Sequence, residues 1–78
     1  MERCMGQFIE FLKPYEGKGF GTDELRMATD SPEWAKEELI SRLNQRHEGL
    51  TERLRENGLG ISTYRGESGE KRFIVESA

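Results

Sequence analysis

The sequence predicts an α+β fold in which three helices are followed by a C-terminal β-hairpin, with residues 1–78 forming one domain. Three observations lead to this prediction. Apolar side chains recur every three or four residues through much of the first 54 positions, as they do on the buried face of a helix. Residues 60–75 instead contain two runs rich in β-branched and aromatic side chains around a glycine-bounded loop. The length of 78 residues suits a single domain whose core is only just large enough for stability.

The composition favours a folded protein of the cytoplasm. Charged residues make up 35% of the chain and hydrophobic residues 33%, which is polar but still patterned for burial. The single cysteine, Cys4, excludes an internal disulfide and fits a reducing compartment. No apolar run approaches the length of a membrane span, and Glu2 and Glu10 interrupt the apolar residues of the first segment, unlike a signal peptide. We therefore expect a cytoplasmic protein that does not contact a membrane.

The first predicted helix carries a wide apolar stripe and ends near residue 13. The stripe consists of Met5, Phe8, Ile9, Phe11 and Leu12. Lys13-Pro14 ends this helix, because the residue before a proline is pushed out of the α region. Three glycines between positions 17 and 21 then leave room for only a short extended segment, in which Phe20 is expected to point inward.

Two further helices are predicted after this connector. Thr22 is expected to cap a short helix that continues to about residue 28 or 29, with two acids in its first turn. The long helix that follows would have Ser31 as its N-cap and Pro32 as its first residue, and would end at Asn57-Gly58. Two helices joined by a short turn, the second one longer, are typical of a helix-turn-helix.

The long helix has one apolar face and one charged face. The side chains predicted on the apolar face are Leu39, Ile40, Leu43, His47, Leu50 and Leu54. Gly49 disfavours a helix by about 1 kcal/mol relative to alanine, which leaves open whether the helix bends or divides there.

The hairpin is predicted from its two strand-like runs, residues 60–65 and 70–75. They flank a glycine-bounded loop of four residues, 66–69, which is a hairpin signature. This loop length places Arg65 opposite Glu70, so that both faces of the hairpin carry some apolar side chains.

The order of three helices and a hairpin resembles the winged helix-turn-helix, in which the third helix lies in the DNA major groove and the hairpin, or wing, contacts the flanking backbone or minor groove. More narrowly, two stretches and three single residues resemble the response-regulator effector domains of the OmpR/PhoB type. They are Ile40-Ser41-Arg42-Leu43, Thr63-Tyr64-Arg65-Gly66, Gly69, Arg72 and Phe73. The resemblance implies that Arg42 lies on the DNA-facing helix and Arg65 in the wing. The sequence departs from that family at Asn44 and Gln45, where family members carry arginines.

The predicted function is therefore that of a DNA-binding module, as in a transcriptional regulator, with double-stranded DNA as its partner. Arg42 and Arg46 would lie one helical turn apart, with Gln45 beside them as a candidate reader of adenine. The full set of predicted DNA-binding residues is Lys36, Arg42, Gln45, Arg46, Arg65, Lys71 and Arg72. The opposing interpretation is that these residues form an ordinary solvated surface.

The distribution of charge supports an alternative function. The net charge is −3, and the first half of the long helix carries Glu33, Glu37 and Glu38, which would repel phosphate. Residues 1–41 contain five Lys/Arg and nine Asp/Glu, whereas residues 42–78 contain seven and six. In the alternative, the winged helix serves as a homodimerisation or protein-interaction module without DNA, and Trp34 is a candidate partner contact.

The sequence gives little support to other chemistry. No hydroxyl or carboxylate group has a recognisable catalytic partner, so we expect no enzyme activity, no cofactor and no small-molecule substrate. His47 has no second histidine or cysteine at metal-ligand spacing, which predicts a packed or edge histidine and no metal site. The glycine-rich stretch at residues 17–22 lacks the order of a phosphate-binding loop.

Overall fold

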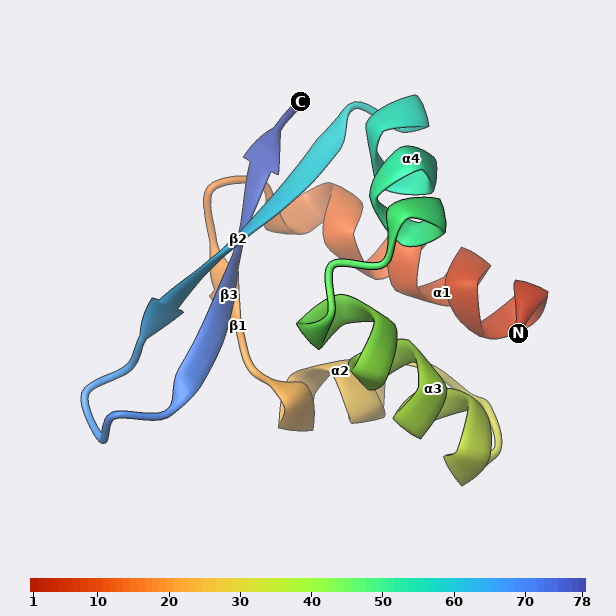
Figure 1. Cartoon of the computed structure of the whole chain (residues 1–78), viewed down its shortest axis with the longest axis horizontal. Coiled ribbons are helices and arrows are strands. Elements are labelled where there is room, and N and C mark those ends of the chain that lie inside the picture. Colours follow the sequence, from red (N-terminus) through yellow and green to blue (C-terminus); the bar gives the residue numbers. More distant parts are fainter.

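The computed structural model describes all 78 residues and confirms an α+β fold, with four α-helices, one 3-10 turn and a three-stranded antiparallel sheet (Figure 1). The elements are α1 (Glu2–Leu12), η1 (Lys13–Tyr15), β1 (Gly19–Phe20), α2 (Thr22–Ala28), α3 (Glu33–Asn44), α4 (Glu48–Glu56), β2 (Leu59–Arg65) and β3 (Lys71–Ser77).

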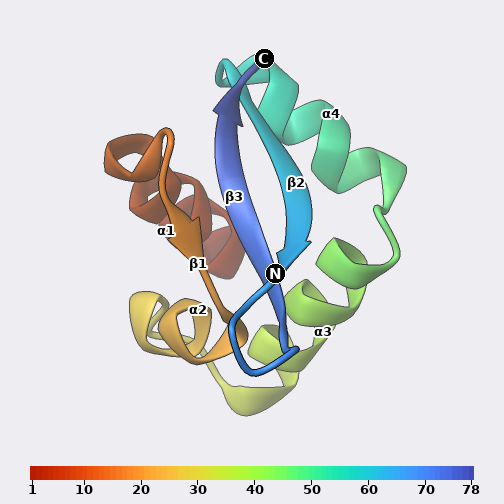
Figure 2. The same cartoon turned by 90° about the vertical axis from the view of Figure 1, so that its left-hand side faces the viewer.

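The sheet has the strand order β1-β3-β2, so the last strand of the chain lies in the middle. The short extended segment predicted around Phe20 is β1. It adds a third strand to the hairpin by pairing with β3, where Phe20 lies opposite Phe73. The α1 and α2 helices lie toward the β1 side of the sheet, and α3 and α4 lie toward the β2 side (Figure 2). The hairpin therefore runs between two pairs of helices.

Phe20 points into the core, as the sequence predicted, and its ring packs against three other aromatic rings. Its ring lies 6.1 Å from that of Phe8, 5.8 Å from that of Phe11 and 5.4 Å from that of Phe73, measured between centroids. Such aromatic pairs add to the stability that apolar burial provides. The buried hydrophobic residues are Cys4, Met5, Phe8, Ile9, Leu12, Phe20, Leu25, Ala35, Leu39, Leu43, Leu50, Leu54, Leu59, Phe73 and Val75.

The predicted long helix is in fact two helices, which makes four helices in place of three. The division lies at residues 45–47 and not at Gly49, because Arg46 adopts a left-handed backbone with φ of 53°. His47 then acts as the N-cap of α4, its Nδ1 accepting a hydrogen bond from the Gly49 N–H at 3.2 Å. The prediction that His47 packs on an apolar face is therefore wrong; its side chain is exposed and satisfies an orphan amide of the helix.

The starts of two helices are each displaced by one residue from the prediction. The N-cap of α2 is Gly21 and not Thr22, and the Gly21 N–H donates to Glu24 Oε1 at 3.1 Å. The N-cap of α3 is Pro32 and not Ser31. At the end of α4, by contrast, Gly58 has the left-handed φ of 73° that the sequence predicted.

The register of the hairpin also differs by one residue from the prediction. Arg65 lies opposite Lys71 and not Glu70, so the connecting loop has five residues, 66–70. The loop is closed by a hydrogen bond from the Gly66 N–H to the Glu70 carbonyl at 2.8 Å. Gly69, with φ of 82°, provides the left-handed position that the extra residue requires. A shift of one residue changes which side chains share a face, and it places Arg72 beside Tyr64.

No helix in the structure combines the length and the apolarity that crossing a membrane requires.

Candidate nucleic-acid interface

The twelve lysine and arginine side chains divide into two groups. Seven form ion pairs with carboxylates: Arg3, Lys13, Arg26, Arg42, Arg53, Arg55 and Arg72. The five that form none are Lys18, Lys36, Arg46, Arg65 and Lys71. A cation without a carboxylate partner is available to a phosphate group, so the positions of these five decide where a nucleic acid would bind.

Two of the unpaired cations lie at the end of the hairpin. Arg65 and Lys71 are directly opposite each other on β2 and β3, and both are exposed. Arg65 Nη1 donates to the Gly69 carbonyl at 2.9 Å, and Lys71 Nζ lies 5.7 Å from the centroid of the Phe73 ring. These contacts hold the side chains without neutralising them, so the end of the hairpin presents two positive charges.

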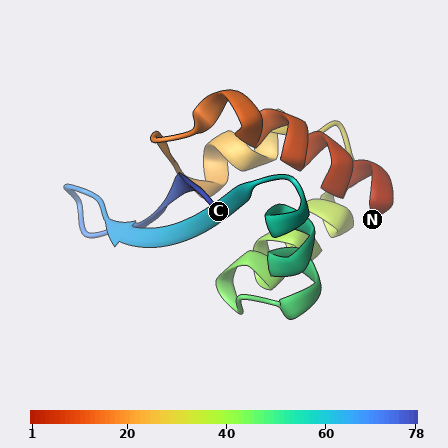
Figure 3. The same ribbon diagram turned by 90° about the horizontal axis from the view of Figure 1, so that it is seen from above.

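A third unpaired cation, Arg46, lies in the turn between α3 and α4. It is exposed, and it lines a groove between α4 and the hairpin whose other wall includes Thr63 and Phe73. We call this hollow, which has a volume of about 420 Å³, the α4–hairpin groove. In the view from above, α3 and α4 lie on one side of the projecting hairpin (Figure 3). Arg65 and Lys71 lie two residues from Thr63 and Phe73 along the strands, and therefore on the hairpin face that lines this groove.

Arg72, predicted as a wing contact, is instead part of a link between the hairpin and α2. Its Nη2 donates to Glu24 Oε1 at 2.8 Å and its Nε to the Tyr64 hydroxyl at 3.2 Å. The hydrogen bond with Tyr64, and then the one with Glu24, raises the pKa of Arg72 above its ordinary value. We call these three residues the Arg72 link. This link could not be predicted from local sequence patterns, because Glu24 and Arg72 are 48 positions apart.

Two glycines make room for the Arg72 link. A Cβ at Gly19 would overlap the hydroxyl of Tyr64, and a Cβ at Gly21 would lie 3.0 Å from Arg72 Nη1. Both glycines flank Phe20 in and beside β1, so the link crosses this strand. The glycines of the connector thus matter for close approach of side chains, and not only for flexibility.

The other predicted helix residues do not form the row that a continuous helix would give. Arg42 is half-buried and its Nε lies 3.6 Å from Glu38 Oε1. Gln45 follows the last residue of α3, and its Nε2 donates to Ser41 Oγ at 3.2 Å. Because α3 ends at Asn44, Arg46 is no longer one helical turn from Arg42.

Lys36 is separated from the other predicted contacts. It lines a second hollow, formed with Arg3 and Gln7 of α1 and Met27 of α2. This hollow and the α4–hairpin groove have no lining residue in common. Lys36 therefore lies apart from the α4–hairpin groove.

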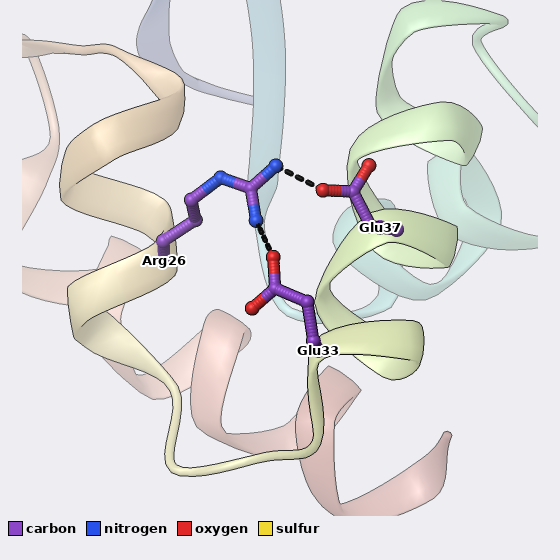
Figure 4. Close-up of polar contacts among 3 residues, drawn as sticks. All are labelled: Arg26, Glu33 and Glu37. Atoms are coloured by element: carbon purple, nitrogen blue, oxygen red, sulfur yellow. Dashed lines mark hydrogen bonds and ion pairs between the residues drawn. The ribbon is translucent and has the colours of Figure 1, made fainter.

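The glutamates in the first half of α3 form ion pairs with arginines of the same chain. Arg26 of α2 places its guanidinium between Glu33 and Glu37 of α3 and binds both carboxylates (Figure 4). The hydrogen bond with Glu37 is the largest cause of the raised pKa of Arg26. Glu38 pairs with Arg42. Each of these three glutamates, whose charge would oppose DNA binding, thus has a cationic partner. The pairing reduces the repulsion that the glutamates exert on phosphate.

Two large apolar side chains are exposed on the helices. Trp34 near the start of α3 is 63% exposed, and Met27 in α2 is 87% exposed. The candidate partner contact at Trp34 is therefore accessible, although single exposed apolar residues are common on monomers.

No group of three or more histidine, cysteine, aspartate or glutamate side chains is arranged to hold a metal ion. The chain matches no protein-family model, no curated protein and no solved structure.

Proposed function

We propose that the chain is a winged-helix module that binds double-stranded DNA, of the kind that regulates transcription. Two features of the fold support this assignment. The strand order β1-β3-β2 and the hairpin that follows the helices are compatible with the winged helix, in which the hairpin contacts DNA beside a recognition helix. One observation carries the proposal: among the five unpaired cations, Arg46 lines the α4–hairpin groove, and Arg65 and Lys71 lie on the same face of the hairpin as Thr63 and Phe73, which line that groove.

In this proposal the unpaired cations contact phosphates, and the C-terminal end of α3 faces the bases. Arg65 and Lys71 would hold the backbone beside the groove, and Arg46 would hold it near the helices. Gln45 has an exposed amide, a group that can form two hydrogen bonds with an adenine edge. Three phosphate contacts predict that log K falls with log salt concentration with a slope of about −3.

The test is a titration of the purified protein into labelled mixed-sequence duplex DNA at several salt concentrations. Replacing Arg46, Arg65 and Lys71 together by alanine is expected to reduce affinity at low salt by at least about tenfold and to remove most of the salt dependence. The matched control replaces Arg3, Lys13 and Lys18, which are exposed elsewhere, so that both variants have a net charge of −6. Equal losses in the two variants, or no binding of the wild type at low salt, would contradict the proposal.

The second candidate is a protein-interaction or dimerisation module, and the observation in its favour is the exposure of Trp34. Trp34 is the only tryptophan, so its fluorescence reports directly on burial at this surface. A concentration-dependent blue shift, together with a doubled mass by light scattering, would favour self-association. Trp34→Ala should then abolish it, whereas a monomer with unchanged emission at high concentration would exclude a homodimer through this surface.

A further inference from the structure

The β2 strand is an edge of the sheet with no strand on its outer side. The order β1-β3-β2 gives β2 a single partner, β3 (Figure 2). One end of their ladder is closed by a hydrogen bond from the Ala78 N–H to the Gly58 carbonyl at 3.0 Å. Because bonded and non-bonded pairs alternate in an antiparallel ladder, the even-numbered residues of β2 bond to β3. The backbone N–H and C=O groups of Ile61, Thr63 and Arg65 therefore point away from β3, toward the free edge.

This edge lacks the features that usually prevent pairing with another chain. The β2 strand contains no proline, and its pairing with β3 continues without a bulge from Leu59 to Arg65. Leu59 is buried, whereas Ile61 is half-buried and both Thr63 and Arg65 are exposed. Each of the last three residues presents one hydrogen-bond donor and one acceptor. An extended peptide backbone satisfies such a row of groups by adding a fourth strand to the sheet.

The charges along this edge are positive. Arg46 lines the α4–hairpin groove together with Ile61, and Arg65 ends the strand; neither arginine forms an ion pair. No carboxylate lines the groove. Glu76, the only carboxylate within β2 and β3, lies opposite Gly60 and so projects from the other face of the hairpin. The two arginines stand at separate points beside the edge. They therefore suit an extended chain, whose carboxylates recur on one face at every second residue, and not a single anion.

We propose that the free edge of β2 binds an extended segment of a partner protein that carries acidic side chains at alternate positions. The segment pairs through its backbone with Ile61, Thr63 and Arg65. Directly opposite residues share a face, so the segment residues that form these hydrogen bonds project on the groove face. Their carboxylates lie toward Arg46 and Arg65, and the alternate side chains lie on the face that carries Tyr64. This interaction does not depend on DNA binding.

The free edge is tested first in the protein alone, by amide hydrogen exchange followed by NMR. The amides of Ile61, Thr63 and Arg65 are expected to exchange faster than those of Ser62 and Tyr64, which bond to β3. Absence of this alternation would overturn the proposal. Light scattering then shows whether a second copy occupies the edge. A dimeric mass that becomes monomeric in Thr63→Pro would assign the edge to self-association and would overturn the acidic partner.

Binding is then measured with short blocked peptides in which valine alternates with glutamate, glutamine or lysine. The glutamate peptide is expected to bind at least about tenfold more tightly than the lysine peptide, with the glutamine peptide between them. It should shift the amide signals of Ile61, Thr63 and Arg65 and slow their exchange with solvent. Equal affinities for the three peptides, or shifts confined to other elements, would overturn the proposal.

The backbone pairing is tested in the glutamate peptide, by methylating the amide nitrogens of one alternate set of residues at a time. In the proposed complex the N–H groups of the glutamates face β2 and those of the valines face away from it. Methylating the glutamates should therefore abolish binding, whereas methylating the valines should leave the affinity close to that of the parent peptide. The same loss from both sets, or no loss from either, would overturn strand addition.

A variant of the protein tests the edge itself. Thr63→Pro removes an N–H that does not bond to β3 and should weaken the glutamate peptide at least about tenfold. The matched control, Thr63→Val, keeps this N–H and should bind as the wild type does. Undiminished binding in Thr63→Pro would overturn the proposal, and if this variant does not fold, the methylated peptides decide the same question.

A second variant tests the charge of the edge. Replacing Arg46 and Arg65 together by alanine should weaken the glutamate peptide about tenfold and change the affinity of the glutamine peptide much less. The matched control replaces Arg3 and Lys13, which are exposed on other elements. Equal losses in the two variants would overturn the acidic partner. All these measurements omit DNA, so their outcome is independent of the proposed function.

Discussion

The base and the tip of the β2–β3 hairpin use one alternating pattern for two purposes. Phe73 and Val75, at the base, are 1% and 0% exposed and belong to the core. Lys71 lies on the same face of the strand two residues earlier, yet it is exposed, because the hairpin there extends beyond the helices (Figure 1). Arg65, opposite Lys71, is exposed for the same reason. Coverage by the helices, and not strand alternation, therefore separates the buried residues of the hairpin from its candidate binding surface.

The largest effect is expected from a substitution at the base of the hairpin. Phe73→Ala removes a ring that contacts Phe20, and it should lower the free energy of unfolding by about 3–5 kcal/mol, measured by chemical denaturation. The comparison is Lys71→Ala, which loses only an exposed contact with the Phe73 ring and should change stability by at most about 1 kcal/mol. Similar losses in both variants would show that the base is not part of the core.

The next prediction tests how closely the Arg72 link packs on β1. Gly19→Ala places a Cβ on the Tyr64 hydroxyl, so we expect a loss of about 1–3 kcal/mol in the free energy of unfolding. The matched control is Gly6→Ala in α1, where no atom lies within 4 Å of the added Cβ. Alanine favours a helix interior over glycine, so the control should gain up to about 1 kcal/mol. An unchanged free energy of unfolding in Gly19→Ala would show that Tyr64 moves aside without loss of stability.

A smaller effect distinguishes the tip from the Arg72 link in DNA binding. Arg65→Ala removes an unpaired cation and should reduce the magnitude of the salt slope by about 1. Arg72→Ala should leave the slope unchanged, because Arg72 is bound to Glu24 and Tyr64. The charge-exchanged variant, with Glu24→Arg and Arg72→Glu together, should recover any affinity lost in Arg72→Ala. If the charge-exchanged variant does not recover the affinity and Arg72→Ala has a smaller salt slope than the wild type, Arg72 contacts phosphate directly.

The smallest effect concerns the ion pair between Glu2 of α1 and Arg53 of α4, at 2.8 Å. The hydrogen bond from Arg53, and then its charge, lowers the pKa of Glu2 below the ordinary value of 4.5. A carboxylate with a lowered pKa in the folded state contributes stability above 4.5, and this contribution is lost as the pH falls through the folded-state pKa. Denaturation of the wild type and Glu2→Gln at pH 7 and pH 3 should therefore show a small difference at pH 7 that shrinks at pH 3. A constant difference would show that the pair does not affect folding.

The sequence predicted the helical stripes, the inward position of Phe20 and the presence of the hairpin because each depends on a local pattern. The division between α3 and α4 was not predictable in the same way. Leu43 and Leu50 are seven residues apart, a spacing that a continuous helix would also place on one face. His47 carried the available signal, since a histidine side chain can accept a hydrogen bond from an orphan amide.

Of the cations that the sequence named as DNA contacts, Arg46, Arg65 and Lys71 are exposed and form no ion pair. Arg72, although named from the same pattern, is occupied by Glu24, which lies 48 positions earlier in the chain. Composition cannot show which cations a fold neutralises, because ion pairs between elements depend on how those elements pack.

The α+β class followed from the amino-acid sequence alone, since periodicity and turn residues act over a few positions and need no distant partner. The same patterns showed which side chains are apolar enough for the core. The division at Arg46, the register of the hairpin and the identity of the unpaired cations instead required the folded structure. These depend on contacts between segments far apart in the chain, where a displacement of one residue or the presence of one carboxylate changes the outcome.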